Sequence, residues 1–267
     1  MTLSSGGATP RPGSDIDFTY RYSPGRSKPF FTPRDWREAA EYLAAGNRKI
    51  VDFCHACRAH GYPPGVSPPV VELSAPEAEG QPKGEDGLPV QMPFAVMVGC
   101  SDARVPTELL FGQEFNDIFN IRVAGNVLAE EGVGSLMYAL RAFAPDGLGP
   151  HHRSLKLAAV LGHRGCGAVT ATVRAFLDPV KGAAAFGEPI GAILRRITSP
   201  ALVAAIEAMS ARFGEGAATD PARIFATIEM TVYLNAAWVA HEVREWVDRS
   251  DPETAERVGV LYTVSDP

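Results

Sequence analysis

Two short segments of the chain each join an apolar run to side chains that can bind a metal. The runs are residues 94–98 and 157–161, and each has the length and composition of a buried strand. A glycine follows each run. Beyond the glycines come a thiol, a carboxylate and a guanidinium in the first segment, and an imidazole and a thiol in the second: Cys100, Asp102, Arg104, His163 and Cys166.

These side chains are expected to meet at one edge of a sheet, because ligands of open α/β sheets bind beyond the carboxyl ends of the strands. Cys100, His163 and Cys166 would supply two thiolates and one imidazole, a set that suits tetrahedral Zn²⁺. Three protein ligands leave one position open, which is typical of a catalytic zinc site. Water bound at such a position loses a proton near neutral pH. The sequence therefore predicts a catalytic zinc site.

Asp102 and Arg104 add a carboxylate and a permanent positive charge beside the first ligand. An arginine can hold a carboxylate through two parallel hydrogen bonds, which keeps the carboxylate ionised and fixed in direction. Asp102 would then accept a hydrogen bond from a metal-bound hydroxide, or it would displace that group and become a fourth ligand. The first arrangement would be active and the second blocked.

The elements around these segments alternate between strands and helices. This order predicts an α/β fold with a mainly parallel central sheet flanked by helices. Strands are predicted at 94–98, 117–123, 157–161 and 257–262. Helices are predicted at 131–143, 168–177, 190–197, 201–213 and 220–248.

The amino-terminal part of the chain is less regular. Residues 1–33 are rich in Gly, Pro, Ser and Arg, which predicts an extended or partly disordered arm before a single domain at 34–267. Thr32 is expected to cap a helix with the following proline at its first position, and a second helical segment is expected at 47–60. Residues 61–90 hold many prolines, glycines and acidic residues, which indicates a loop insertion.

The composition excludes several classes of protein. The chain has 267 residues, 46% of them hydrophobic, and a net charge of −6, so it has no basic excess to bind nucleic acid. No apolar run reaches the roughly 18 residues that a membrane span needs. The amino terminus shows no secretory signal, and two of the four cysteines stand beside His or Asp, which favours metal binding in a reducing compartment. We therefore expect a cytoplasmic protein.

Taken together, the two motifs resemble the zinc and Asp–Arg signature of the β-class carbonic anhydrases. The first motif is Cys-x-Asp-x-Arg at 100–104, and the second is His-x-x-Cys at 163–166. The resemblance extends from about residue 35 to residue 262, except for the 61–90 segment. Further segments carry it: Ala45–Arg48, Arg122–Asn126, Gly134–Tyr138 and Cys166–Ala168.

This resemblance implies reversible hydration of CO2 to bicarbonate and a proton, by attack of hydroxide on one Zn²⁺ per chain. Cys100, His163 and Cys166 would hold the metal. Asp102, fixed by Arg104, would orient the hydroxide so that its lone pair faces the carbon.

The resemblance also implies how the chain binds its substrate and assembles. Gln91, Gly167 and Tyr138 match residues that bind substrate. An N-terminal helical arm would embrace a second subunit, so a homodimer is the minimal unit and a tetramer is left open. The active cleft would lie at the dimer interface.

One branch of the family carries a non-catalytic bicarbonate site built from Trp, Arg and Tyr. Met97 stands where that Trp would be, although Arg122 and Tyr262 resemble the other two residues. The sequence therefore favours the branch without bicarbonate inhibition. The chain also departs from the family pattern, because it stops at Pro267 soon after the last predicted strand and because its 61–90 segment is long.

Two other functions remain open. One is hydrolysis of carbon disulfide or carbonyl sulfide on the same fold, since the same nucleophile could attack either compound. The other is a non-enzymatic, zinc-stabilised binding module in which Asp102 closes the fourth position.

Two further clusters contain metal-binding residue types. Cys54 and Cys57, with histidines nearby, resemble half of a zinc site, but the sequence shows no second half and the segment is predicted to be helical. His151 and His152 lie in a Gly/Pro-rich loop, where solvated side chains are favoured over a proton relay.

Overall fold

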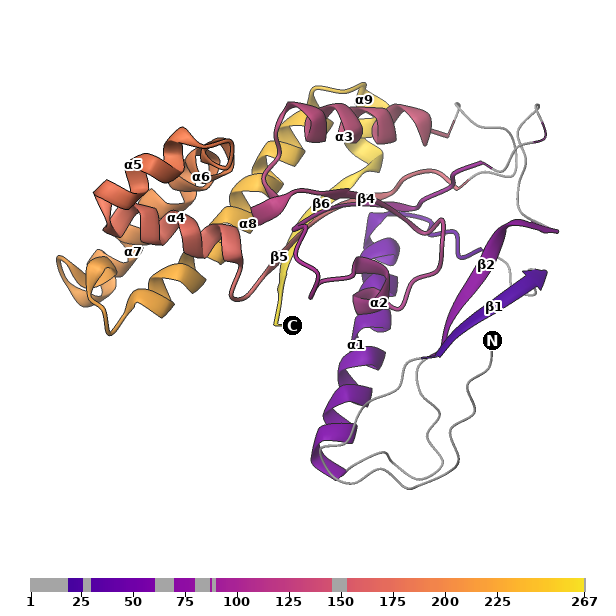
Figure 1. The fold of residues 1–267 in the computed structure, drawn as a ribbon. Coiled ribbons are helices and arrows are strands. Elements are labelled where there is room, and N and C mark those ends of the chain that lie inside the picture. Colours follow the sequence, from indigo (N-terminus) through magenta and orange to yellow (C-terminus); the bar gives the residue numbers. More distant parts are fainter. Residues whose placement is uncertain are drawn as a thin grey trace. The chain divides into compact units, whose positions relative to one another are not determined.

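The computed structural model describes residues 19–25, 30–60, 70–79, 87, 90–145 and 153–266. The chain divides into two compact units (Figure 1). The first comprises Met1–Phe31, Ala40–Gln91 and Glu108–Phe115; the second comprises Thr32–Ala39, Met92–Thr107 and Asn116–Pro267. All five residues predicted to form the metal site belong to the second unit.

The second unit is built on a parallel sheet of four strands, which confirms the predicted fold class. The strand order is β4 (Ile118–Arg122), β3 (Ala95–Gly99), β5 (Leu157–His163) and β6 (Gly259–Ser265). Every residue of β3 and β5 is buried. Their continuous apolar runs are typical of parallel strands that are covered on both faces.

The chain order creates a switch point between β3 and β5. After β3 the chain passes to β4 on one side, and it then returns to form β5 on the other side. Because Gly99 pairs with Leu161, the two strands end at the same edge of the sheet. A crevice for ligands is expected at this position in a parallel α/β sheet.

Helices α3 (Glu130–Ala142) and α8 (Ile224–Asp248) cover one face of this sheet. Burial of each large apolar side chain in such a core contributes about 1.5–3 kcal/mol. The core includes side chains from both helices and from the two central strands: Val96, Val98, Leu136, Leu140, Val160, Val239, Val243 and Val247. Helix α3 is close to its predicted range, and α8 begins four residues later than predicted.

Four shorter helices gather beside α8 (Figure 1). They are α4 (Gly167–Leu177), α5 (Pro179–Gly187), α6 (Gly191–Ile197) and α7 (Val203–Phe213). The predicted break at Ser199-Pro200 is confirmed, because the peptide between them is cis and Ser199 leaves the helical conformation.

Helices α5 and α9 (Pro252–Arg257) were not predicted. The signal for α9 is present in the sequence. The side chain of Asp251 accepts a hydrogen bond from Thr254 N, and Pro252 occupies the first helical position. Both features mark the start of a helix.

The predicted start of the first long helix was wrong. Helix α1 spans Trp36–His60, and its cap is Asp35 rather than Thr32. The Asp35 carboxylate accepts hydrogen bonds of 2.9 Å from the amides of Arg37 and Glu38. These amides are free donors in the first turn of any helix, so an acceptor at this position fixes where the helix begins.

Helix α1 is also continuous, whereas the sequence indicated two helical segments. Gly46 lies inside it because a Cβ atom there would stand 1.9 Å from the carbonyl oxygen of Phe111, in helix α2 (Thr107–Phe111). The neighbouring Asn47 donates a hydrogen bond of 2.8 Å to Leu110 O. Glycine therefore allows α1 to approach α2 closely, and the helix is not interrupted.

Strands β1 (Thr19–Gly25) and β2 (Val70–Glu79) form a separate two-stranded parallel sheet. The prediction of a loop was wrong for β2, which begins with two β-branched valines and contains a proline that an edge strand tolerates. Most other residues of the predicted arm and loop lie outside the described residues, as do His151 and His152. No helix in the described part of the chain is long and apolar enough to cross a membrane.

A buried ion pair joins the segments that lead into the three neighbouring strands β4, β3 and β5. The Arg153 guanidinium, 2% exposed, lies 2.7 Å from the carboxylate of Asp117. It also donates hydrogen bonds to Met92 O at 2.8 Å and to Asn116 O at 2.7 Å. One side chain thus contacts a buried carboxylate, a buried carbonyl group and a partly buried one.

Replacement of Arg153 by methionine is expected to lower the free energy of unfolding by about 3–5 kcal/mol, because the buried Asp117 would lose its ion pair with Arg153. Urea denaturation measures this change. The matched control is Arg141→Met on the exposed side of α3, where a change within about 0.5 kcal/mol is expected. Equal stability of the two variants would contradict the role assigned to the pair.

Candidate metal centre

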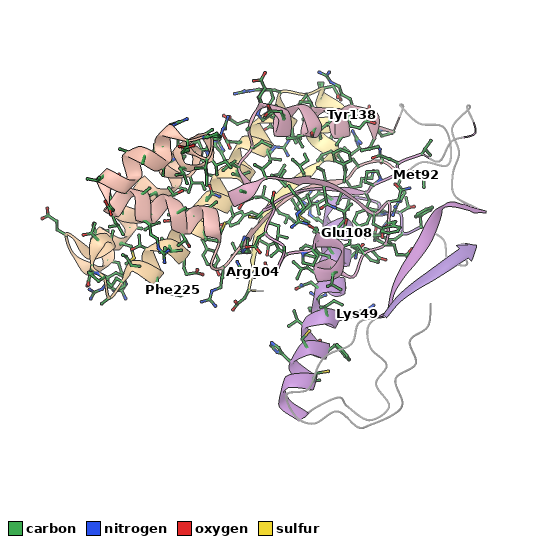
Figure 2. The ribbon with its side chains drawn as sticks, viewed as in Figure 1. Lys49, Met92, Arg104, Glu108, Tyr138 and Phe225 are labelled. Atoms are coloured by element: carbon green, nitrogen blue, oxygen red, sulfur yellow. The ribbon has the colours of Figure 1, made fainter. Side chains whose placement is uncertain are left out.

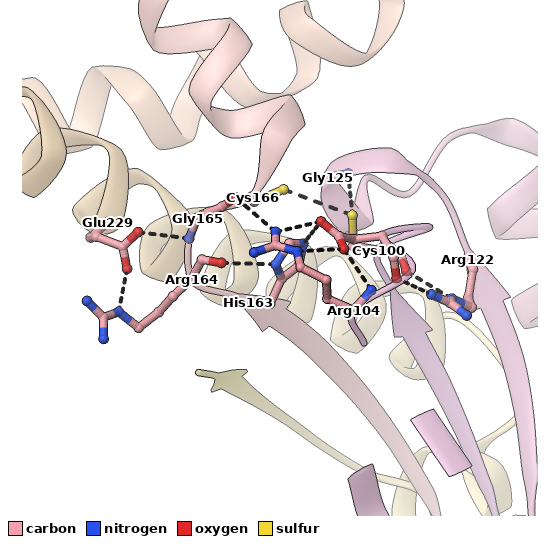
Figure 3. Close-up of polar contacts among 10 residues, drawn as sticks. Cys100, Arg104, Arg122, Gly125, His163, Arg164, Gly165, Cys166 and Glu229 are labelled. Carbon is pink, nitrogen blue, oxygen red and sulfur yellow. Dashed lines mark hydrogen bonds and ion pairs between the residues drawn. The ribbon is translucent and has the colours of Figure 1, made fainter. Parts of the chain in front are cut away.

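The three predicted ligands come from two turns at the switch point (Figure 3). Cys100 follows the last residue of β3, and His163 is the last residue of β5. Cys166 stands at the start of α4, after a turn in which Gly165 has a φ of +62°. This left-handed conformation favours glycine, so the turn between the second and third ligands depends on that residue.

The ligand atoms have the spacing of a zinc site. The sulfur atoms of Cys100 and Cys166 are 4.0 Å apart, and the three ligand atoms all lie within 4.8 Å of one another. Tetrahedral zinc with bonds of about 2.3 Å to sulfur places two sulfur atoms about 3.8 Å apart. All three residues are buried. Among the residues that the structure describes, they are the one group with such spacing.

His163 is oriented for a metal bond through Nε2. Its Nδ1 lies 3.1 Å from Arg164 O, which can accept only if Nδ1 carries the proton. Nε2 then presents a lone pair, is buried, and makes no hydrogen bond of ordinary geometry. A buried polar atom without a partner is costly, and a metal ion would satisfy it.

The pKa values of the two cysteine thiols are shifted in opposite directions. The pKa of Cys100 is lowered to about 4, first by its hydrogen bond with Cys166 and further by contacts with His163 and the amide of Gly125. The pKa of Cys166 is raised, first by the same hydrogen bond and then by burial. Cys100 is therefore the thiolate of the pair, and metal binding would displace the remaining proton.

Asp102 and Arg104 form the predicted ion pair. Asp102 Oδ1 accepts hydrogen bonds from Arg104 N at 2.9 Å and Nε at 3.0 Å, and Oδ2 accepts from Nη2 at 2.7 Å. These bonds lower the pKa of Asp102 to about 2. Asp102 Oδ2 also lies 3.7 Å from His163 Nε2. An ionised carboxylate is thus fixed beside the ligand cluster.

Further contacts that the sequence analysis did not predict hold the first ligand turn. Arg122, at the end of β4, donates to Cys100 O at 2.9 Å and to Asp102 O at 2.6 Å. The amide of Gly125 donates to Cys100 Sγ at 3.2 Å, and the Gly125 carbonyl accepts from Asn235 Nδ2 at 2.8 Å. These contacts fix the first turn from two sides.

Glu229, on α8, holds the second turn. Its Oε1 accepts from Gly165 N at 2.9 Å, and its Oε2 accepts from Arg164 Nε at 2.8 Å. Glu229 and Asn235 were the available signals in the sequence, because both are polar residues within an apolar stretch at 228–239. The sequence predicted a helix at 220–248 but gave neither residue a role.

The three predicted substrate-binding residues lie in different parts of the structure. Gly167 is exposed at the first position of α4, directly beside Cys166. Tyr138 is exposed on α3, with its ring centroid 6.0 Å from that of Phe119, whose partner in β3 is Val96, away from the ligand edge (Figure 2). Gln91 is exposed and belongs to the first compact unit. The substrate roles of these residues stay predictions.

Cys54 and Cys57 lie on α1 and belong to no group with metal-ligand spacing among the described residues. Cys57 is buried and Cys54 is partly buried.

A family model described as "Carbonic anhydrase" matches residues 95–262, more than half of the chain. The matched region contains the three candidate ligands and the Asp102–Arg104 pair. The chain belongs to the β-class carbonic anhydrase family.

Two curated carbonic anhydrases are similar to the chain over a shorter stretch. The carbonic anhydrase of Mycolicibacterium smegmatis is 41% identical over 85 residues, which cover 32% of this chain and 36% of the relative. Carbonic anhydrase 2 of Mycobacterium tuberculosis is 39% identical over 88 residues, which cover 33% of this chain and 38% of the relative. The chain thus matches little more than a third of the length of these carbonic anhydrases.

Solved β-carbonic anhydrase structures are also similar to the chain. One of the tetrameric β-carbonic anhydrases of Sordaria macrospora has a TM-score of 0.45 and 18% identity, over 66% of this chain and 77% of that one. A Coccomyxa β-carbonic anhydrase in complex with acetazolamide has a TM-score of 0.44 and 18% identity, over 83% of this chain and 80% of that one.

Purified protein is expected to contain about one zinc per chain, and Cys166→Ala is expected to lose it, because two protein ligands hold zinc too weakly. Elemental analysis after dialysis measures the content. Cys57→Ala, which removes a buried thiol from α1, is the matched control and should keep its zinc. Zinc retained at the parent level by Cys166→Ala would rule out this ligand set.

Proposed function

We propose that the protein catalyses the zinc-dependent, reversible hydration of CO2 to bicarbonate and a proton. One observation carries this proposal: two thiols and an imidazole converge beside a carboxylate that an arginine holds through both oxygens. A purely structural zinc site commonly has four protein ligands. Here a further carboxylate, Asp102, lies 3.7 Å from His163 Nε2 and is engaged by Arg104.

Cys100 Sγ, His163 Nε2 and Cys166 Sγ would hold the metal. Zinc, when bound, supplies a water-derived nucleophile near neutral pH. Because the pKa of Asp102 is about 2, its carboxylate carries no proton at neutral pH and can only accept a hydrogen bond. Asp102 thereby orients the attacking group and directs its free lone pair towards the carbon of CO2.

Arg104 fixes the orientation of the Asp102 carboxylate. The guanidinium binds both carboxylate oxygens, and its Nη2 also donates to Gly165 O at 3.1 Å. This second contact anchors Arg104 to the turn between His163 and Cys166. The Asp102 carboxylate is therefore drawn towards Arg104, which favours the open arrangement over the blocked one.

Gly167, Gln91 and Tyr138 are proposed to bind substrate. Gly167 lies beside Cys166, and without a side chain it leaves room for a small apolar molecule. We place the active cleft at the interface of a homodimer, and pairing of dimers into a tetramer is compatible with this arrangement. A residue remote from the ligands within one chain can then line the cleft of the neighbouring subunit.

We assign the chain to the branch without bicarbonate inhibition and to the cytoplasm. Met97 is buried in β3, where the other branch carries a tryptophan. The Arg122 guanidinium is engaged by Cys100 O and Asp102 O, which supports a role in holding the ligand turn.

Asp102→Asn is expected to retain zinc and to lose CO2 hydration by about 100-fold or more, because the amide can donate to the nucleophile and orients it less well. Stopped-flow hydration with a pH indicator measures the rate. The control is Asp248→Asn near the end of α8, where activity should be unchanged.

Parent-level hydration by Asp102→Asn would contradict the role of this carboxylate. Assay of carbonyl sulfide and carbon disulfide alongside CO2 tests the alternative hydrolase, which would release hydrogen sulfide and fail to hydrate CO2. A zinc-containing protein that is inactive towards all three compounds would favour the non-enzymatic module.

A further inference from the structure

The carboxylate of Glu229 lies beside the turn between His163 and Cys166, on the side away from Cys100 (Figure 3). Its two oxygens accept hydrogen bonds from Gly165 N at 2.9 Å and from Arg164 Nε at 2.8 Å. Both residues stand between His163 and Cys166 in the sequence. The Glu229 side chain is 13% exposed, and its partner Arg164 is 40% exposed.

Gly165 is the position in this turn with the greatest conformational freedom. Its φ of +62° lies in a region that other residues rarely occupy. Glu229 holds its N–H, and Arg104 Nη2 donates to its carbonyl oxygen at 3.1 Å. Contacts on both sides of one glycine fix the direction in which the chain leaves His163 and enters Cys166.

Helix α8 gives Glu229 a rigid base. The helix has 25 residues, and the neighbouring Ile228 and Val232 are buried. The same helix supports the first ligand indirectly, because Asn235 donates to Gly125 O at 2.8 Å and Gly125 N donates to Cys100 Sγ at 3.2 Å. One packed helix therefore supports the two halves of the ligand set.

We propose that Glu229 is a positioning residue for the metal centre, an inference that rests on the zinc site of the proposed function. By holding Gly165, Glu229 keeps His163 Nε2 and Cys166 Sγ directed towards Cys100. It also keeps Gly165 O in place for Arg104. Glu229 touches neither substrate nor metal and acts through the backbone of the turn.

A carboxylate is needed because Gly165 N and Arg164 Nε are both donors. Glutamine has nearly the same shape, but its amide offers one acceptor oxygen and one NH2 group. In either orientation of a glutamine side chain, one donor faces the NH2 group. The Glu229→Gln substitution therefore removes one of the two contacts without creating a cavity.

The test is the zinc affinity of Glu229→Gln, measured by competition with a chromophoric chelator, together with the visible spectrum of the cobalt-substituted protein. We expect zinc to bind about 10–100-fold more weakly, because loss of groups that orient metal ligands has effects of this size. The cobalt absorption bands should also change. The control is Glu242→Gln, a partly buried glutamate on the same helix that pairs with Arg196 and should leave both readouts unchanged.

Zinc affinity within about twofold of the parent, with an unchanged cobalt spectrum, would overturn the inference. If Glu229→Gln does not fold, Glu229→Asp decides by the same measurements, since its shorter carboxylate cannot span both donors. Zinc affinity and CO2 hydration of the parent are measured first. A parent that binds zinc but does not hydrate CO2 would contradict the proposed function and leave the affinity test of Glu229 intact.

Discussion

The parallel pairing of β3 with β5 is the constraint on which the site depends. The two strands are paired with Gly99 opposite Leu161, so both strands end at the same edge of the sheet, at its switch point. Cys100, His163 and Cys166 are thereby brought together although 66 positions separate the two cysteines. A shift in the register of this pair would separate the ligands.

Convergence of two thiols and an imidazole in a buried place is unfavourable unless their polar atoms are satisfied. Neighbouring backbone groups satisfy some of these polar atoms. Gly125 donates to Cys100 Sγ, and the carbonyl of Arg164 accepts from the His163 ring. The remaining unpaired atom, His163 Nε2, faces the place where a metal would complete the set. Asp102, tied to Arg104, then stands beside the ligands as a hydrogen-bond acceptor.

Much of this site could be predicted from the sequence because each half is local. Each half consists of a strand, a glycine and ligands within a few positions of one another, so the sequence shows it directly. The alternation of strands and helices likewise predicted the parallel fold. The supporting contacts were not visible, because Glu229 is 64 positions from Gly165 and Asn235 is 110 positions from Gly125. Local signals also competed: Thr32 and Asp35 are both good helix caps, and Asp35 is the residue that accepts from the amide of the first turn.

The most direct test of this account is stopped-flow CO2 hydration by one preparation before zinc removal with a chelator, after removal, and after zinc is returned. The account predicts that hydration falls to the uncatalysed rate without zinc, while circular dichroism shows that the protein remains folded, and that activity returns with about one zinc per chain. Undiminished hydration by folded, metal-free protein would contradict it, as would a zinc-loaded protein that does not hydrate CO2.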